Sequence, residues 1–129
     1  MKLHANSFLL GCLSILVPFT AATFLRSQQP PAQTQRTPQF ENEDVKVWKS
    51  LVLPKAPLTM HRHDHPRIII ALNGGTMNIV DDQGAAEPQV WETGKAYWLP
   101  ANPPGTQHAD VNTGTQPIEV MVVELKKEN

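Results

Sequence analysis

The sequence contains one cysteine in 129 residues, Cys12. If the amino-terminal leader is removed, the mature chain has no thiol, which excludes disulfide bonds and a cysteine nucleophile. The chain also lacks a G-x-S-x-G nucleophile motif and a G-x-x-x-x-G-K-[ST] phosphate-binding loop. The sequence therefore offers no sign of covalent thiol or serine catalysis, or of a phosphate cradle.

Clusters of basic residues are equally scarce. The 11 Lys and Arg residues nearly balance the 12 Asp and Glu residues, and the one basic doublet, Lys126-Lys127, stands at the carboxyl end. A nucleic-acid surface needs a basic stripe or patch, so we expect no nucleic-acid partner. Amphipathic helical runs are also absent after the leader. Twelve prolines and seven glycines instead indicate many short elements joined by turns.

Residues 1–22 predict an export signal peptide. Residues 7–17 form an apolar stretch of suitable length, Pro18 ends it, and small residues precede a cut after Ala22. An uncleaved membrane anchor stays open as an alternative, because residues 7–25 approach the ~20 residues that span a bilayer. Lipidation of Cys12 is disfavoured, since the apolar run continues past it. In each case we expect the domain in the periplasm or secreted.

Residues 23–42 predict a flexible linker that is rich in Gln, Pro and Thr. Within it, residues 26–40 carry almost no apolar side chains that could offset the entropy of ordering. We therefore expect one folded domain over residues 43–129, small but long enough for one core.

Alternating apolar residues and turn signals then predict about eight strands. Such regular spacing is typical of an all-β sandwich or barrel. Tyr97 and Trp98 are neighbours and point to opposite strand faces, so one of them should face the interior. The predicted strands are residues 45–53, 58–63, 68–72, 76–80, 89–92, 94–100, 106–111 and 118–125.

Three histidines alternate in the segment MHRHDH. On a strand, residues two apart share a face, so His61 and His63 should project together. Neutral imidazole is the commonest metal ligand, and His108 is the one remaining histidine that could supply a third. Spacing alone also allows chance, or exposed histidines in a turn near Pro66. For His65, which precedes this proline, we favour the turn.

These residues resemble the two sequence motifs of the cupin superfamily. The first is G-x5-H-x-H-x3-4-E-x6-G, and here His61 and His63 are followed by Arg67 and Gly74, with Lys55 in place of the leading glycine.

The second cupin motif is G-x5-P-x-G-x2-H-x3-N. The chain has Gly94, Pro100, Gly105, His108 and Asn112 in this order, with four residues instead of one between the proline and the second glycine. The resemblance implies a small antiparallel jelly-roll β-barrel with a metal in its mouth. It implies His61, His63 and His108 as ligands of a divalent transition metal, with iron first and nickel, copper, zinc or manganese as alternatives.

Arg67 stands where the family usually has a glutamate ligand. A guanidinium stays protonated and cannot bind a cation, so three outcomes are open. In the first outcome, the site has three histidines only, as in the thiol dioxygenases of this superfamily. Alternatively, Asp64, His65 or Asp110 replaces the glutamate, and Asp110 is the best placed because it shares a strand face with His108. In the third outcome, the site has lost its metal.

Arg67 can itself be interpreted in two ways. It could hold a substrate carboxylate by two hydrogen bonds, or it could pair with Asp64 or another acid at the strand end. The leading hypothesis is an exported cupin that acts like a dioxygenase or an isomerase on a small anionic molecule. The alternative is a non-catalytic module for a small ligand or a sugar, with the metal lost or structural. A homodimer is expected in either case, and a membrane contact only with an uncleaved leader.

Overall fold

The computed structural model describes residues 32–127, which form nine β-strands and no helix. Every pairing between the strands is antiparallel, which confirms the prediction of an all-β fold. Accordingly, the described part of the chain has no helix that is long and apolar enough to cross a membrane. The predicted signal peptide, residues 1–22, lies outside the described residues.

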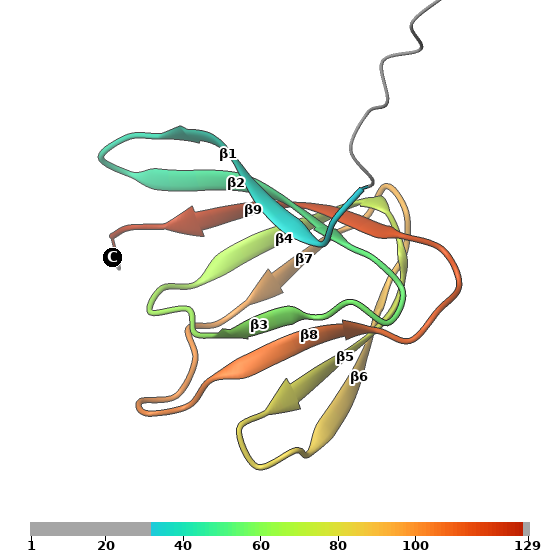
Figure 1. Ribbon diagram of the computed structural model, residues 1–129. Coiled ribbons are helices and arrows are strands. Elements are labelled where there is room, and N and C mark those ends of the chain that lie inside the picture. Colours follow the sequence, from blue (N-terminus) through green and yellow to red (C-terminus); the bar gives the residue numbers. More distant parts are fainter. Residues whose placement is uncertain (1–31, 128–129) are drawn as a thin grey trace, which may run out of the picture. The chain divides into compact units, whose positions relative to one another are not determined.

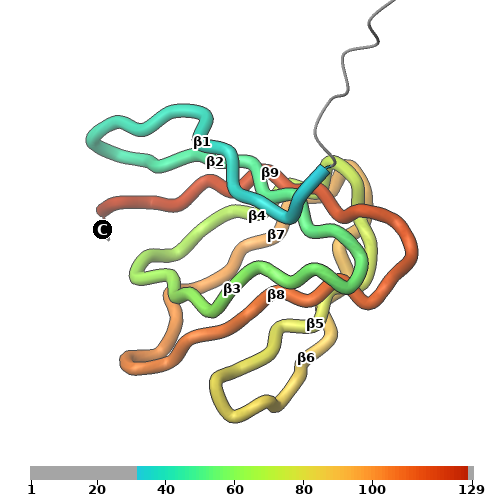
Figure 2. The backbone as a smooth tube through the Cα atoms, viewed as in Figure 1, coloured from blue at the N-terminus to red at the C-terminus, as the bar shows by residue number. Residues whose placement is uncertain are grey.

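The strands form two sheets that face each other as a jelly roll (Figure 1). One sheet has five strands in the order β1-β2-β9-β4-β7, and the other has four in the order β3-β8-β5-β6. Figure 2 shows the same backbone path, with the long turn between β8 and β9 crossing from one sheet to the other. The strand bounds are β1 Gln35–Glu41, β2 Val45–Val52, β3 Leu58–His61, β4 Arg67–Asn73, β5 Gly75–Asp81, β6 Ala86–Trp91, β7 Ala96–Leu99, β8 His108–Asn112 and β9 Ile118–Leu125.

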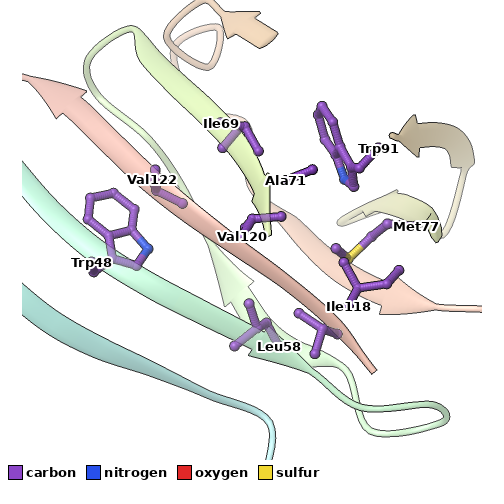
Figure 3. Close-up of a cluster of buried hydrophobic side chains, with 10 residues drawn as sticks. Trp48, Leu58, Ile69, Ala71, Met77, Trp91, Ile118, Val120 and Val122 are labelled. Carbon is purple, nitrogen blue, oxygen red and sulfur yellow. The ribbon is translucent and has the colours of Figure 1, made fainter. Parts of the chain in front are cut away.

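The core lies between the two sheets and follows the alternation of β9. Ile118, Val120 and Val122 on this strand are all buried, while the residues between them are only partly covered. In Figure 3 they point toward Trp48 of β2 and Met77 of β5, which also belong to the core. Burial of these large apolar side chains is the main favourable contribution to folding.

Trp98 and Tyr97 confirm that neighbouring residues of β7 face opposite sides. Trp98 is exposed, whereas Tyr97 packs against the core and stacks edge-on against Trp91 at 4.9 Å between ring centroids. The Tyr97 hydroxyl also accepts a hydrogen bond from the backbone N–H of Glu92.

β1 differs from the sequence-based expectation, because it lies inside the predicted linker. Residues 35–41 pair with β2 along most of their length, so the strands begin at Gln35 rather than near Glu43, and the total is nine instead of eight. All seven residues of β1 are exposed. An edge strand of this kind is held by backbone hydrogen bonds to its neighbour and leaves little apolar signal in the sequence.

Lys55, at the position of the missing first-motif glycine, is the one non-glycine residue with a positive φ in the described range, at 60°. It lies in a tight turn where the backbone N–H of Ala56 donates to the carbonyl of Leu53. The backbone therefore keeps a left-handed conformation that favours glycine although the glycine is absent.

The NGG segment, expected to be a tight turn, is a corner between the two sheets: β4 and β5 belong to different sheets. A Cβ on Gly74 would lie 2.0 Å from the carbonyl oxygen of Trp91, so only glycine fits at this corner.

Candidate metal centre

His61, His63 and His108 come together, as the sequence predicts. One ring nitrogen from each lies within 4.8 Å of the others. His61 ends β3 and is paired across the sheet with His108, the first residue of β8. The three rings are close neighbours, with centroids 4.4 Å apart for His61 and His108 and 5.0 Å apart for His61 and His63.

We expected His61 and His63 to lie close together because they share a face of one strand, and this reason is only half correct. β3 ends at His61, so His63 lies beyond the strand and does not share a strand face with it. His63 is instead held by the loop after β7. The side chain of Asn102 accepts from the backbone N–H of His63 at 2.8 Å, and the backbone N–H of Asn102 donates to the carbonyl of His63 at 2.8 Å.

Two of the three rings are fixed in a form that suits a metal. Nδ1 of His61 donates to the carbonyl of Thr59 at 2.8 Å, and Nδ1 of His63 donates to the carboxylate of Glu124 at 3.0 Å. In each ring the other nitrogen, Nε2, then keeps its lone pair. Nε2 of His61 is buried and has no hydrogen-bond partner in the described residues. Orphaned buried nitrogens are rare, and a metal ion would satisfy this one.

His108 is oriented differently. Its Nδ1 lies 3.2 Å from Nδ2 of Asn102. Because the Asn102 oxygen already accepts from His63, its amide N–H faces His108, and Nδ1 acts as the acceptor. The proton of neutral His108 then lies on Nε2, which is 3.6 Å from a carboxylate oxygen of Asp110. Metal binding through Nε2 requires this proton to move to Nδ1, next to the amide nitrogen of Asn102.

Burial keeps the three histidines neutral. It lowers the pKa of His61 to about 4, although the hydrogen bond to Thr59 opposes the shift. It lowers the pKa of His108 to about 3, helped by the neighbouring histidines, and it also lowers the pKa of His63. Neutral imidazole is the form that binds metals, so burial gives all three histidines the charge state that a metal site needs at neutral pH.

Asp110, the suggested extra ligand, lies beside the cluster. Its carboxylate oxygens are 3.8 Å from Nε2 of His61 and 3.6 Å from Nε2 of His108. Burial raises the pKa of Asp110 to about 6, and the positive charges of Arg36 and Arg67 oppose the shift. Asp110 is therefore close enough to neighbour a metal ion.

Arg67, at the usual glutamate position, is buried on β4 and lines a cavity of about 280 Å³ between the sheets. Nη1 of Arg67 donates to the carbonyl of Pro100 at 3.0 Å. Arg67 does not pair with Asp64, since that carboxylate binds Arg62 at 2.7 Å on the surface. His63, His108 and Asp110 line the same cavity, so Arg67 faces a space that two of the three histidines also line.

His65 lies in the bend between β3 and β4, as expected, and is partly buried there. It does not belong to the group of three histidines whose nitrogens converge.

Sequence reasoning missed three residues of the site. Glu124 comes from β9, Asn102 from the lengthened stretch of four residues between Pro100 and Gly105 in the second motif, and Arg36 from the predicted linker. The insertion was a visible signal, because an extra loop beside a motif histidine can carry an additional contact. Glu124 and Arg36 had no comparable signal, since only the pairing of β1, β2 and β9 places them near the histidines.

Comparison with solved structures identifies the architecture. The chain is similar to a cupin domain from Bordetella pertussis Tohama I, with a TM-score of 0.64 and 22% sequence identity over 74% of this chain and 95% of that one. It is also similar to an RmlC-like cupin with a double-stranded β-helix fold from Methanocaldococcus jannaschii, with a TM-score of 0.57 and 15% identity over 76% and 84% of the two chains.

These likenesses confirm the cupin fold that the two motifs suggest. Identities at this level show the fold and do not carry a function. Neither a scan against family models nor a search of curated proteins finds a match for this sequence.

Proposed function

We propose that this protein binds one divalent transition metal through His61, His63 and His108 and holds a small anionic molecule beside it. The observation that carries the proposal is the buried, unpartnered Nε2 of His61, which lies within 4.8 Å of nitrogens from the other two histidines. Nitrogen ligands favour iron, nickel, copper or zinc over magnesium or calcium, and iron is the first candidate.

The metal, when bound, would supply Lewis-acid or redox chemistry at positions that the three histidines leave open. The chain's own residues would bind and orient the substrate. Arg67 can hold a carboxylate by two parallel hydrogen bonds, and Ile69, Leu99 and Val122 line the cavity with apolar surface that excludes water. A substrate held between Arg67 and the histidines has a fixed orientation. We infer a dioxygenase-like or isomerase-like reaction from this arrangement.

Metal content separates this proposal from its main rival, a non-catalytic module for a small ligand or sugar. Protein purified without a histidine tag should contain about one transition-metal ion per chain by mass spectrometry. His61→Ala and His108→Ala should each remove it. His65→Ala, a histidine outside the cluster, should retain it. A metal-free protein, or one whose metal survives both cluster substitutions, would favour the binding module.

Catalysis is tested after the metal has been identified. Oxygen consumption by the metal-loaded protein should be measured with panels of small carboxylic acids and thiols. Turnover that disappears in His108→Ala supports an oxygenase. Conversion without oxygen uptake, followed by NMR of the substrate panel, supports an isomerase.

Export and self-association are further proposals that rest on the sequence. The leader predicts cleavage after Ala22, which the mass of the mature protein would reveal. The exposed edge strand β1 is compatible with pairing between two copies, and light scattering during size-exclusion chromatography would measure the expected homodimer.

A further inference from the structure

A second arginine reaches the cavity from β1. Arg36 pairs with Ser50 across the β1–β2 ladder, and its side chain lies over Trp48 with the guanidinium carbon 5.5 Å from the ring centroid. Trp48 is buried and stacks against His63 at 5.9 Å between centroids. Arg36 itself is exposed, so it stands where the cavity meets solvent, while Arg67 lies deeper.

Neither arginine is neutralised by a direct ion pair. None of the ion pairs among residues 32–127 includes Arg36 or Arg67. Burial lowers the pKa of Arg67 to about 10, the charges of Asp110 and Glu124 raise it, and Arg36 lowers it. Both guanidiniums line the same cavity, so their positive charges repel each other there. Like charges gathered in a low-dielectric space are costly unless an anion joins them.

The charges of the cavity favour such an anion once a metal is bound. The carboxylates of Asp110 and Glu87 line the cavity with the two guanidiniums, and Glu124 binds His63 beside it. A divalent ion at the histidines adds two positive charges, which leaves the space net positive even with all three carboxylates ionised. Anion and metal should therefore bind with positive coupling.

The wall of the cavity limits the kind of anion. Ile69, Leu99 and Val122 line it together with Trp91, so a fully polar ion such as phosphate would leave this surface without a contact. The volume of about 280 Å³ lies just below the ~300–1,000 Å³ typical of small-molecule sites. The ligand should be small, with an apolar body and one charged end.

We propose that Arg36 and Arg67 together form the anion-binding end of this cavity, and that its ligand is a small carboxylic acid with an apolar body. This inference rests on the proposed function and deepens it, because His63 and His108 line the same cavity. It assigns the specificity for charge to two strands, and it makes β1 part of the binding site. Each guanidinium has donors left for a carboxylate, since the one hydrogen bond of Arg67 in the described residues goes to Pro100.

Butyrate and its neutral isostere butyramide are suitable probes. Zinc-loaded protein is titrated with each, and binding is followed by NMR at the arginine Nε–Hε signals, which Arg36→Lys and Arg67→Lys assign. Butyrate should shift both signals and bind at least about tenfold more tightly than butyramide, the strength expected of a charge-assisted hydrogen bond. Arg36→Gln and Arg67→Gln should each reduce this preference about tenfold.

The matched control is Arg62→Gln, because Arg62 is paired with Asp64 on the surface and does not line the cavity. It should leave the preference unchanged. The NMR dispersion and melting temperature of Arg36→Gln show whether its fold is intact. If it is, the loss of butyrate preference does not come from unfolding. If Arg36→Gln unfolds, Arg36→Lys takes its place. This variant keeps the positive charge but cannot donate two parallel hydrogen bonds, so it should show a smaller loss of the preference for butyrate over butyramide.

Three results would overturn the inference. Equal binding of butyrate and butyramide would remove the role of charge. An unchanged preference for butyrate in Arg36→Gln would show that Arg36 does not contribute to anion binding and that Arg67 acts without it. Binding of inorganic phosphate in place of butyrate would mean a polar oxyanion site. Titration of the metal-free protein keeps the two proposals apart. Without the metal, the two guanidiniums stand against three carboxylates, so butyrate should bind more weakly but still shift both arginine signals. A protein that binds no zinc and still shows these shifts contradicts the metal site only.

Discussion

Asn102 links two of the three clustered histidines through a single amide group. Its oxygen accepts from the backbone of His63 and its nitrogen faces Nδ1 of His108. The spacing of the histidines predicts which residues meet, but it carries no information about which ring nitrogen holds the proton. That choice depends on Thr59, Glu124 and Asn102, each of which contacts a different ring. Such partners commonly alter metal affinity by about 10- to 100-fold.

Asn102→Asp should strengthen metal binding. A carboxylate of the same shape can still accept from the backbone of His63, and its second oxygen can accept from Nδ1–H of His108. The lone pair of Nε2 would then face the cluster. We expect zinc affinity at pH 7.5 to increase up to about tenfold, as measured by competition with a chromogenic chelator.

Asn102→Leu serves as the comparison, since it removes both hydrogen bonds and should weaken zinc binding. An Asn102→Asp variant that binds zinc more weakly than the native protein would contradict this role for His108 Nδ1.

At the scale of turns and strands, Lys55 has the left-handed backbone conformation of the motif glycine that it replaces. A left-handed conformation costs a non-glycine residue about 1–2 kcal/mol, and the exposed side chain of Lys55 offers no evident compensation. Lys55→Gly should therefore raise the free energy of unfolding. Part of the gain is offset by the greater freedom of glycine in the unfolded chain, which leaves about 0.5–1 kcal/mol. Urea unfolding measures it. Lys55→Ala retains the left-handed cost, so a matching gain there would contradict this explanation.

The corner at Gly74 should tolerate no side chain. A Cβ there would meet the Trp91 carbonyl oxygen at 2.0 Å and the Thr93 backbone nitrogen at 2.8 Å, and both are backbone atoms that cannot rotate away. Gly74→Ala should lower the free energy of unfolding by about 2–3 kcal/mol, measured by urea unfolding.

Gly114→Ala is the control for this corner. The nearest atom to its new Cβ is a side-chain oxygen of Asn112 at 3.2 Å. Equal losses in the two variants would show that the close approach at Gly74 is not the cause.

At the scale of the whole molecule, the site depends on contacts between distant segments. β1, β2 and β9 lie side by side in one sheet, while β3 and β8 carry His61 and His108 in the other. The apolar core and the charged cavity share the space between the sheets. The same burial that stabilises the fold therefore lowers the pKa values of the histidines and raises that of Asp110.

The stability of the metal-free protein should rise with pH between about 4 and 6.5. The pKa of His61 is about 4 and that of His108 about 3 when folded, against about 6.5 when unfolded. In this window the unfolded chain binds more protons at these sites, so the free energy of unfolding increases as pH rises. Asp110 opposes this trend, because its folded pKa of about 6 exceeds the unfolded value of 3.8. Two histidines outweigh one carboxyl, and His63 adds to them in the same direction.

Urea unfolding of the metal-free protein at pH 5 and pH 7.5 measures the effect. Asp110→Asn removes the opposing group and should make the rise with pH steeper. His61→Gln removes a contributing histidine and should make it shallower. Stability that falls between pH 5 and pH 7.5 would contradict the burial of neutral histidines.

Local patterns in the sequence determined the strand-rich fold, eight of the nine strands and the three histidines that meet. Alternation and turn residues act between neighbours in the chain, and the two motifs place His61, His63 and His108 with their approximate spacing. The tertiary structure alone decided that Arg36 reaches the cavity, that Glu124 binds His63, and that Arg67 has no ion pair among the described residues. The order of the strands brings these residues together from positions as far apart in the chain as 36 and 124. Pairing over such distances depends on which sheet edges meet, and no short stretch of sequence contains that information.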